Sequence, residues 1–375
     1  MNTITGAYCS AIIYNTTHTP LDPYAIHQIQ FLCDHPSFEN CKVRIMPDVH
    51  PGTLSTIGFT STLGSTVLPN VIGIDIGCGV TMAQITGRIN EYEKLDKVIR
   101  ETVPSGFNIH KSPLGKADEI DLSQLRCFQH INSSVAYRSL GTLGGGNHFI
   151  EVGKDESKNA YLTVHSGSRH LGKEVTEYYL KQGQKQLKEK GITVPYELTY
   201  LQGDLMQDYL YDLQVVTQYA AFNRELIISS ICKRMKWKVK DTVSCNHNYI
   251  DFDMDPPVIR KGAISAKDGE NVIIPINMKE GIIVGTGKGN SEWNFSAPHG
   301  AGRICSREEV KNKFTVNQYR KEMKGIYSSC ISSSTLDEAP FAYRTLDEIT
   351  EVLSETVNIN QVIRPVYNYK AGGKE

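Results

Sequence analysis

The spacing of hydrophobic and polar residues divides the chain into helical and extended stretches. Apolar residues that recur every three to four positions predict helices, and alternation or a short apolar run predicts a strand. Helical spacing predicts helices at residues 22–33, 90–103, 173–190 and 204–236. Asp22 and Pro23 suit the cap and the first position of the first helix. Two Ser/Thr-x-x-Glu capping boxes, beginning at Ser306 and Thr345, predict two more helices, the second over residues 346–357.

Extended stretches fill much of the remaining chain. Short apolar or β-branched runs predict strands at residues 11–14, 42–46, 71–80, 161–165, 243–250, 271–275 and 281–284. We find no internal repeat and no linker. The glycine-rich motifs are spread from residue 48 to residue 300, so a site built from them requires one domain over residues 1–375. The predicted class is α+β, with a β-sandwich-like core of short strands flanked by helices.

Composition narrows the classes of protein. The 375 residues include 40 basic and 41 acidic side chains, so nucleic-acid binding requires a local basic patch. The nine cysteines form no C-x-x-C pair, which argues against zinc ribbons and thioredoxin-like sites. The chain begins without a signal-peptide pattern, and no apolar run approaches the roughly 20 residues that span a bilayer. We therefore expect a cytoplasmic protein with reduced cysteines.

Four strand-like runs end in residues that bind metals, flanked by glycine or small residues. The first, Val71–Val80, presents Asp75 and Cys78, and the others present His148, His165 and His247. One such residue alone is more often a structural cysteine or a hydrogen-bonded core histidine. Together the five exceed the usual ligand number of a catalytic zinc, so we predict two ions bridged by the Cys78 thiolate. The mixed sulfur, nitrogen and oxygen set is compatible with Mn²⁺, Co²⁺ or Zn²⁺.

Three further motifs have polar or glycine-rich signatures. His299 lies four residues before Arg303, and it is either a nucleophile near a phosphate-binding arginine or a loop histidine bonded to its own backbone. Gly144–Gly146 could form a phosphate-binding nest, but they match no nucleotide fingerprint. Arg169 could hold a phosphate or cap a helix.

At this point the motifs together resemble the RtcB family of RNA-splicing and RNA-repair ligases. The resemblance runs in the family's order from about residue 40 to the C-terminus. It rests on MPDVH (46–50), IGIDIGCGV (72–80), LGGGNHFIE (143–151), VHSGSRHLG (164–172), CNHNYI (245–250), PHGAGR (298–303), DEAPFAYR (337–344) and IRPVYNYKAG (363–372). Such a series is far more specific than any one member.

The resemblance implies an RNA ligase dependent on GTP and on two Mn²⁺ ions. It would join a 2′,3′-cyclic phosphate or 3′-phosphate RNA end to a 5′-hydroxyl end, in RNA repair or tRNA splicing. By matching positions, Asp75, Cys78, His148, His165 and His247 would bind the metals, and His299 would carry GMP. Asn147, Glu151 and Lys370 match positions that contact the guanylate, Asp48 an acidic active-site position, and Arg169 one that handles RNA or phosphate.

One stretch departs from the family pattern. Pro275–Gly281 stands where relatives carry a Pro-Gly-Ser-Met-Gly-like turn, and Ile276 and Lys279 replace two glycines. The alternative function is therefore a metal-dependent RNA-end phosphohydrolase that does not form the nucleotidyl intermediate. A third is a non-catalytic RNA-binding factor, against which the intact ligand set argues. The short chain resembles a compact subgroup linked to RNA repair and to a release-factor-like partner, and we expect a monomer without membrane association.

Overall fold

The chain folds around two large β-sheets, which confirms the predicted α+β class. The computed structural model describes residues 2–14 and 20–371. Within these residues, the first sheet has six strands in the spatial order β1 (Asn2–Thr5), β2 (Ser10–Ile13), β3 (Val43–His50), β4 (Ile57–Thr62), β10 (Val258–Lys261) and β9 (Asn248–Asp251). The β2–β3 pair is parallel, and the other pairs are antiparallel.

The second sheet is antiparallel throughout and carries the site described below. Its seven described strands run in the order β12 (Asn271–Asn277), β13 (Gly281–Gly287), β15 (Val357–Lys370), β6 (Phe149–Lys154), β7 (Ala160–Ser166), β5 (Gly79–Thr86) and β8 (Lys238–Asn246). A short pair, β11 (Ala263–Ser265) and β14 (Ser296–Pro298), lies between the sheets, because β11 contacts both β4 and β8.

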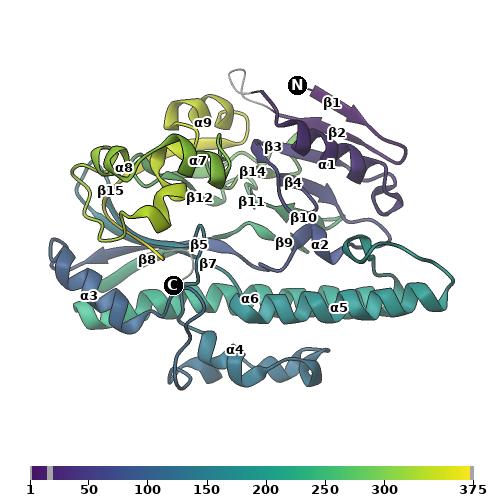
Figure 1. Cartoon of the computed structure of the whole chain (residues 1–375), viewed down its shortest axis with the longest axis horizontal. Coiled ribbons are helices and arrows are strands. Elements are labelled where there is room, and N and C mark those ends of the chain that lie inside the picture. The colour runs from purple at the N-terminus through teal and green to yellow at the C-terminus, as the bar shows by residue number, and fades with distance from the viewer. Residues whose placement is uncertain (1, 15–19, 372–375) are drawn as a thin grey trace.

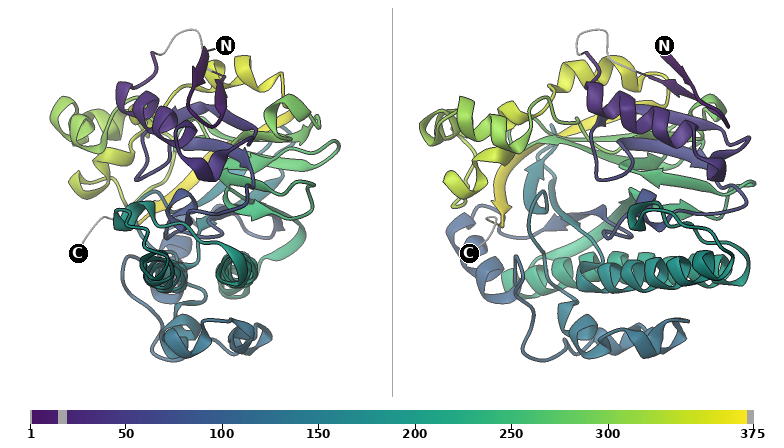
Figure 2. Two further views of the ribbon diagram at one scale, coloured as in Figure 1. Left: turned by 90° about the vertical axis from the view of Figure 1, so that its right-hand side faces the viewer. Right: turned by 45° about the vertical axis from the view of Figure 1, so that its right-hand side comes forward.

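Helices cover the sheets on two sides (Figure 1). The described α-helices are α1 (Pro23–Cys33), α2 (Pro69–Ile72), α3 (Tyr92–Thr102), α4 (Ser133–Ser139), α5 (Arg169–Glu189), α6 (Gly203–Met235), α7 (Arg307–Lys313), α8 (Val316–Glu322) and α9 (Leu346–Leu353). The long helices α5 and α6 run side by side beneath the sheets, as both views of Figure 2 show in teal. Neither they nor any other described helix combines the length and the apolar character needed to cross a bilayer.

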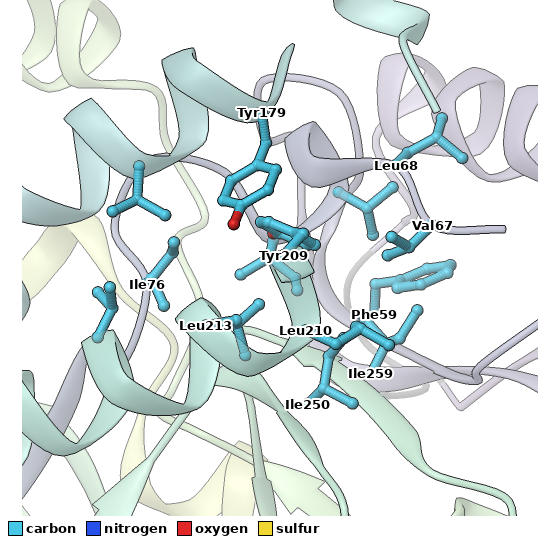
Figure 3. Packing of buried hydrophobic residues seen from close by; sticks show 14 of the residues in the cluster. Phe59, Val67, Leu68, Ile76, Tyr179, Tyr209, Leu210, Leu213, Ile250 and Ile259 are labelled. Carbon is cyan, nitrogen blue, oxygen red and sulfur yellow. The ribbon is translucent and has the colours of Figure 1, made fainter. Parts of the chain in front are cut away.

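The largest hydrophobic cluster joins α5 and α6 to the first sheet (Figure 3). Leu213 of α6 is fully buried there, and burying a leucine side chain stabilises the fold by about 1.5–3 kcal/mol. Tyr179 of α5 is also buried, and its hydroxyl donates a hydrogen bond of 2.6 Å to Asp212. Because α6 also contacts β5, β7 and β8, it holds the second sheet in a fixed position against the first.

Most predicted helices are confirmed. Asp22 caps α1 by accepting hydrogen bonds from the amides of Tyr24 and Ala25, with Pro23 at the first helical position. The capping boxes at Ser306 and Thr345 open α7 and α9. The last of these helices is shorter than predicted and ends at Leu353, because the chain turns there into β15.

The predicted strand over residues 71–80 is wrong. Its first residues end α2, and β5 begins only at Gly79. Gly73 and Gly77 have φ angles of +79° and +71°, which a strand does not allow. A Cβ on Gly77 would lie 2.8 Å from Ala220 of α6, so the glycine permits a turn pressed against that helix. Within this turn Ile76 is buried, whereas Ile74 is exposed.

Candidate metal and nucleotide site

The five predicted metal ligands lie together near the ends of neighbouring strands of the second sheet. Cys78 directly precedes β5 and His148 directly precedes β6, whereas His165 lies near the end of β7 and His247 follows β8. The prediction that each follows a strand is therefore wrong for Cys78 and His148. Convergence results from the antiparallel arrangement, in which the start of one strand neighbours the end of the next.

The pairing register fixes which residues meet. His165 on β7 lies opposite Val80 on β5 and opposite Phe149 on β6. Gly79 on β5 lies opposite Asn246, the last residue of β8. The next residue after Asn246 leaves the sheet, which divides the predicted 243–250 strand into β8 and β9. The register therefore places the thiol of residue 78 between imidazoles from both neighbouring strands.

Ligand-type atoms surround the Cys78 thiol. Its Sγ lies 3.5 Å from Nε2 of His148 and 3.3 Å from Nε2 of His165. Nε2 of His148 lies 3.6 Å from Oδ2 of Asp75, and Nε2 of His165 lies 3.3 Å from Nε2 of His247. Ligands about 2.0–2.3 Å from a tetrahedral ion are separated from each other by roughly 3.3–3.8 Å. These spacings therefore fit two three-residue groups that share Cys78.

Hydrogen bonds orient two of the imidazoles toward the thiol. Nδ1 of His148 lies 2.8 Å from the carbonyl oxygen of Leu143, and Nδ1 of His165 lies 3.2 Å from that of Asn147. A carbonyl only accepts hydrogen bonds, so both Nδ1 atoms carry the proton and both Nε2 atoms present a lone pair. Burial lowers the pKa of His165 and His247 well below the usual value, which keeps both rings neutral.

The thiol and the carboxylate of this cluster favour a cation between them. Burial and the neighbouring Asp75 carboxylate raise the pKa of the Cys78 thiol. A bound divalent cation reverses the effect on the thiol, because a coordinating thiol is deprotonated. The donor set is therefore suited to a borderline-soft divalent metal.

His299 faces this cluster and is held by Asp48. Its ring centroid lies 4.7 Å from that of His247. Its Nδ1 lies 2.7 Å from Oδ2 of the fully buried Asp48, and its backbone amide donates to the same oxygen at 3.2 Å. The partner of the ring is thus a carboxylate rather than the histidine's own backbone. Since Nδ1 donates to Asp48, Nε2 keeps its lone pair.

A cavity opens beside His299. Asn147, Glu151 and Lys370, which were predicted to contact a guanylate, all line it. The unusual Pro275–Gly281 stretch spans the end of β12, the following turn and the start of β13, and residues from it line the cavity. Side-chain oxygen Oδ1 of Asn277 accepts the amides of Lys279 and Glu280, so this turn has its own polar cap.

Comparison with known proteins identifies the relatives of this chain. The family model described as tRNA-splicing ligase RtcB matches residues 28–132 and 114–371. The chain belongs to the RtcB family. The RNA-splicing ligase RtcB of Escherichia coli K12 is 30% identical, over 86% of this chain and 88% of that protein. The RNA-splicing ligase RtcB2 of Escherichia coli ATCC 25922 is 26% identical over 95% and 94%, and the tRNA-splicing ligase RtcB of Nanoarchaeum equitans is 26% identical over 86% of each chain.

Arg169 does not line the His299 cavity. It is the first residue of α5, with a φ of +57°. Its Nε donates to Oγ1 of Thr142 at 3.0 Å, and its Nη2 donates to the carbonyl of Gly106 at 2.6 Å. The guanidinium thus braces two loops of this RtcB-family chain and does not cap its own helix.

Sequence reasoning assigned no role to Glu338, which the structure places beside Lys370. The ammonium of Lys370 donates to Oε2 of Glu338, and the hydroxyl of Tyr343 donates to the same atom at 2.6 Å. Burial acts to raise the pKa of Glu338, but Lys370 and Arg307 outweigh burial and lower it to about 2. The carboxylate therefore stays ionised and fixes Lys370 at the cavity wall. Glu338 lies in the DEAPFAYR motif (337–344), which was the sequence signal that could have identified it.

Two buried polar residues of α6 were also missed. Asn223 accepts the amides of Gly141 and Thr142 at 2.8 and 3.1 Å, next to the triple-glycine loop. Arg224 donates to the carbonyls of Gly77 and Ser166 at 2.9 and 3.0 Å, directly beside two ligand positions. Both positions fall in the apolar stripe of the predicted helix, and polar residues in such a stripe are the sequence signal for buried hydrogen-bonding groups.

We expect Glu151 to make stability depend on pH. Burial raises its pKa to about 8, against opposing effects of Asn368 and Lys370. The folded state therefore keeps a proton that the unfolded chain loses above about pH 4.5, so the free energy of unfolding falls as pH rises from about 5 to 8. Glu151→Gln should flatten this slope in denaturant titrations at several pH values. An unchanged slope would show that Glu151 is already ionised.

Proposed function

We propose that this chain is an RNA ligase that joins a 2′,3′-cyclic phosphate or 3′-phosphate RNA end to a 5′-hydroxyl end. The relatives named above are RNA-splicing and tRNA-splicing ligases. GTP would supply the energy through a histidine-GMP intermediate on His299. The enzyme would act as a monomer in the cytoplasm, in RNA repair or tRNA splicing, in a pathway shared with a release-factor-like partner.

The observation that carries this proposal is the His299–Asp48 pair next to the ligand cluster. The carboxylate lies 2.7 Å from Nδ1 and fixes the tautomer whose Nε2 is nucleophilic. As positive charge develops on the attacking ring, the buried carboxylate stabilises it. A histidine that only supported the loop would not need a fully buried carboxylate with a second, unpaired oxygen, Oδ1.

The reaction would proceed in three transfers. Nε2 of His299 attacks the α-phosphate of GTP, forming an N–P bond while the bond to pyrophosphate breaks. The RNA 3′-phosphate then attacks the same phosphorus, and GMP passes from His299 to the RNA end. Finally the 5′-hydroxyl attacks the activated 3′-phosphate, a phosphodiester forms, and GMP leaves. A cyclic phosphate would first be opened by water to the 3′-phosphate.

Two Mn²⁺ ions are the proposed cofactors, and the donor atoms described above fit them. Asp75, Cys78 and His148 would hold one ion, and Cys78, His165 and His247 would hold the other. When bound, such ions offset negative charge on phosphates and on the leaving pyrophosphate. Lys370, held by Glu338, lines the same cavity and would contact the guanylate.

Unpaired acceptors in the cavity support guanine as the base. Oε1 of Glu151 and Oδ1 of Asn368 are buried and have no partner among the described residues. Guanine presents N1–H and an amino group as adjacent donors, and Glu151 would accept them once ionised, so guanine binding would release the proton that burial holds on this group. Adenine lacks the N1–H donor and would leave at least one of these acceptors unpaired, which costs about 1–3 kcal/mol for a buried group. We therefore propose selection of GTP over ATP.

A paired assay tests the proposal. The protein is incubated with Mn²⁺ and α-labelled GTP or ATP, and acid-labile label on the protein is measured. In parallel, an RNA with a 3′-phosphate is mixed with one bearing a 5′-hydroxyl, and the joined product is measured. We expect label from GTP and joined RNA. Phosphate release from RNA ends without label from either nucleotide would instead identify the metal-dependent phosphohydrolase.

A further inference from the structure

A second, larger hollow lies next to residues that neighbour the ligand cluster. Its lining includes four cationic side chains, those of Arg100, Arg169, Lys173 and Lys370. Among the described residues that line it there is no aspartate or glutamate. Arg100, Lys173 and Lys370 each contact a carboxylate that does not line this groove, namely Asp96, Glu177 and Glu338, so the cations face the groove and their acidic partners lie outside its lining.

The groove reaches the ligand cluster along two loops. Ile74, which precedes the ligand Asp75, lines the groove. Gly145 and Gly146, which precede Asn147 and His148, line it as well. Lys370 lines both the groove and the His299 cavity, so the two hollows adjoin at this residue. A chain of phosphates in the groove would therefore lead toward the reacting centre.

Phe107 stands at this groove with its ring in solvent. Its side chain is 88% exposed, the largest value among the exposed large hydrophobic residues described. Its backbone is nevertheless held on both sides. The amide of Gly106 donates to the carbonyl of Gly144 at 2.9 Å, and Arg169 donates to the carbonyl of Gly106. The amide of Asn108 closes a turn by donating to Ser105 at 3.1 Å.

Single exposed hydrophobic residues are common and usually need no explanation. Phe107 differs because its exposed ring lies on a braced loop at a cationic groove. An aromatic face next to a row of cations is the arrangement that binds single-stranded nucleic acid, where bases stack on rings and phosphates contact lysine and arginine. An acidic protein partner would use the cations, but it would not need an isolated ring beside them.

We infer that Phe107 stacks on an unpaired base of the RNA end and that the groove cations hold its backbone, so that the enzyme selects ends with an unpaired nucleotide. This inference rests on the proposed RNA ligase activity. Base stacking on an aromatic residue is worth about 5- to 100-fold in affinity. The braced backbone adds to this because little conformational freedom is lost when the ring binds.

Binding of a short fluorescent RNA tests the inference independently of chemistry. The probe carries a 3′-phosphate and is single-stranded, and its affinity is measured by anisotropy without GTP. We expect Phe107→Ala to weaken binding by roughly 5- to 100-fold and Phe107→Trp to restore it. Tyr24→Ala is the matched control, because Tyr24 is an exposed aromatic on α1, away from the groove. A probe with an abasic terminal nucleotide should bind wild type more weakly than the natural probe does, whereas the two probes should bind Phe107→Ala with equal affinity.

Each outcome decides one question. Stacking is overturned if Phe107→Ala binds RNA as tightly as wild type. It is also overturned if the substitution weakens binding of the abasic probe and of the natural probe by the same factor. Labelling of His299 by GTP is measured in the same variants and should be unchanged, because Phe107 does not line the nucleotide cavity. Loss of labelling and joining in the wild type would instead contradict the ligase proposal.

Discussion

Replacing His299 with alanine is expected to abolish both labelling by GTP and RNA joining. The imidazole is the proposed acceptor of GMP, and methyl cannot replace its lone pair. Removing a nucleophile of this kind lowers turnover on the order of 10⁴-fold or more. The measurements are acid-labile label on the protein and the rate of joined product. Residual joining within about 10-fold of wild type would show that His299 is not the nucleophile.

Two variants sharpen this test. His27→Ala is the matched control, because His27 is exposed on α1 and should leave both measurements unchanged. Asp48→Asn keeps the size of the side chain but removes the charge beside Nδ1 of His299. We expect it to lower labelling about 10²–10⁴-fold without changing metal content. Equal labelling in Asp48→Asn would limit Asp48 to a structural role.

Local signals account for the parts of the fold that the sequence predicted well. The N-cap Asp22 and the capping boxes at Ser306 and Thr345 act within a single turn, so they mark helix starts without tertiary information. The strand predicted over residues 71–80 was wrong because its conformation depends on tertiary contacts. Its apolar residues are equally suited to a buried turn, and only the contact of Gly77 with α6 decides between the two.

The candidate ligands were predictable by residue type but not by position. Cysteine and histidine flanked by glycine predicted a metal centre, and each ligand was predicted to stand at the end of a strand. Cys78 and His148 instead precede their strands. The antiparallel register, with His165 opposite both Val80 and Phe149, is a long-range property that no local pattern contains. The same is true of Arg224 and Glu338, whose partners are distant in the chain.

Cys78→Ala should remove bound metal and, with it, both labelling and joining. The thiol belongs to both three-residue groups, so one substitution takes a ligand from each. Loss of one ligand typically lowers metal affinity by far more than the 10- to 100-fold expected for loss of an outer partner. The measurement is metal content by elemental analysis after reconstitution with Mn²⁺, followed by the paired assay. Retention of full metal content would exclude Cys78 as a bridge.

Cys232→Ala provides the matched control, because Cys232 is a buried cysteine that belongs to neither ligand group. Both variants delete a buried sulfur, so both lose some stability through the cavity left behind. Only Cys78→Ala should lose metal, and its melting temperature should no longer rise when Mn²⁺ is added, since an ion stabilises a protein only by binding the folded state. Cys78→Ser then separates the thiolate from side-chain size: a hydroxyl fills the space but is not deprotonated as readily, so metal content should remain low. Wild-type metal content in Cys78→Ser would mean that the other four ligands suffice and that the thiolate does not join the two ions.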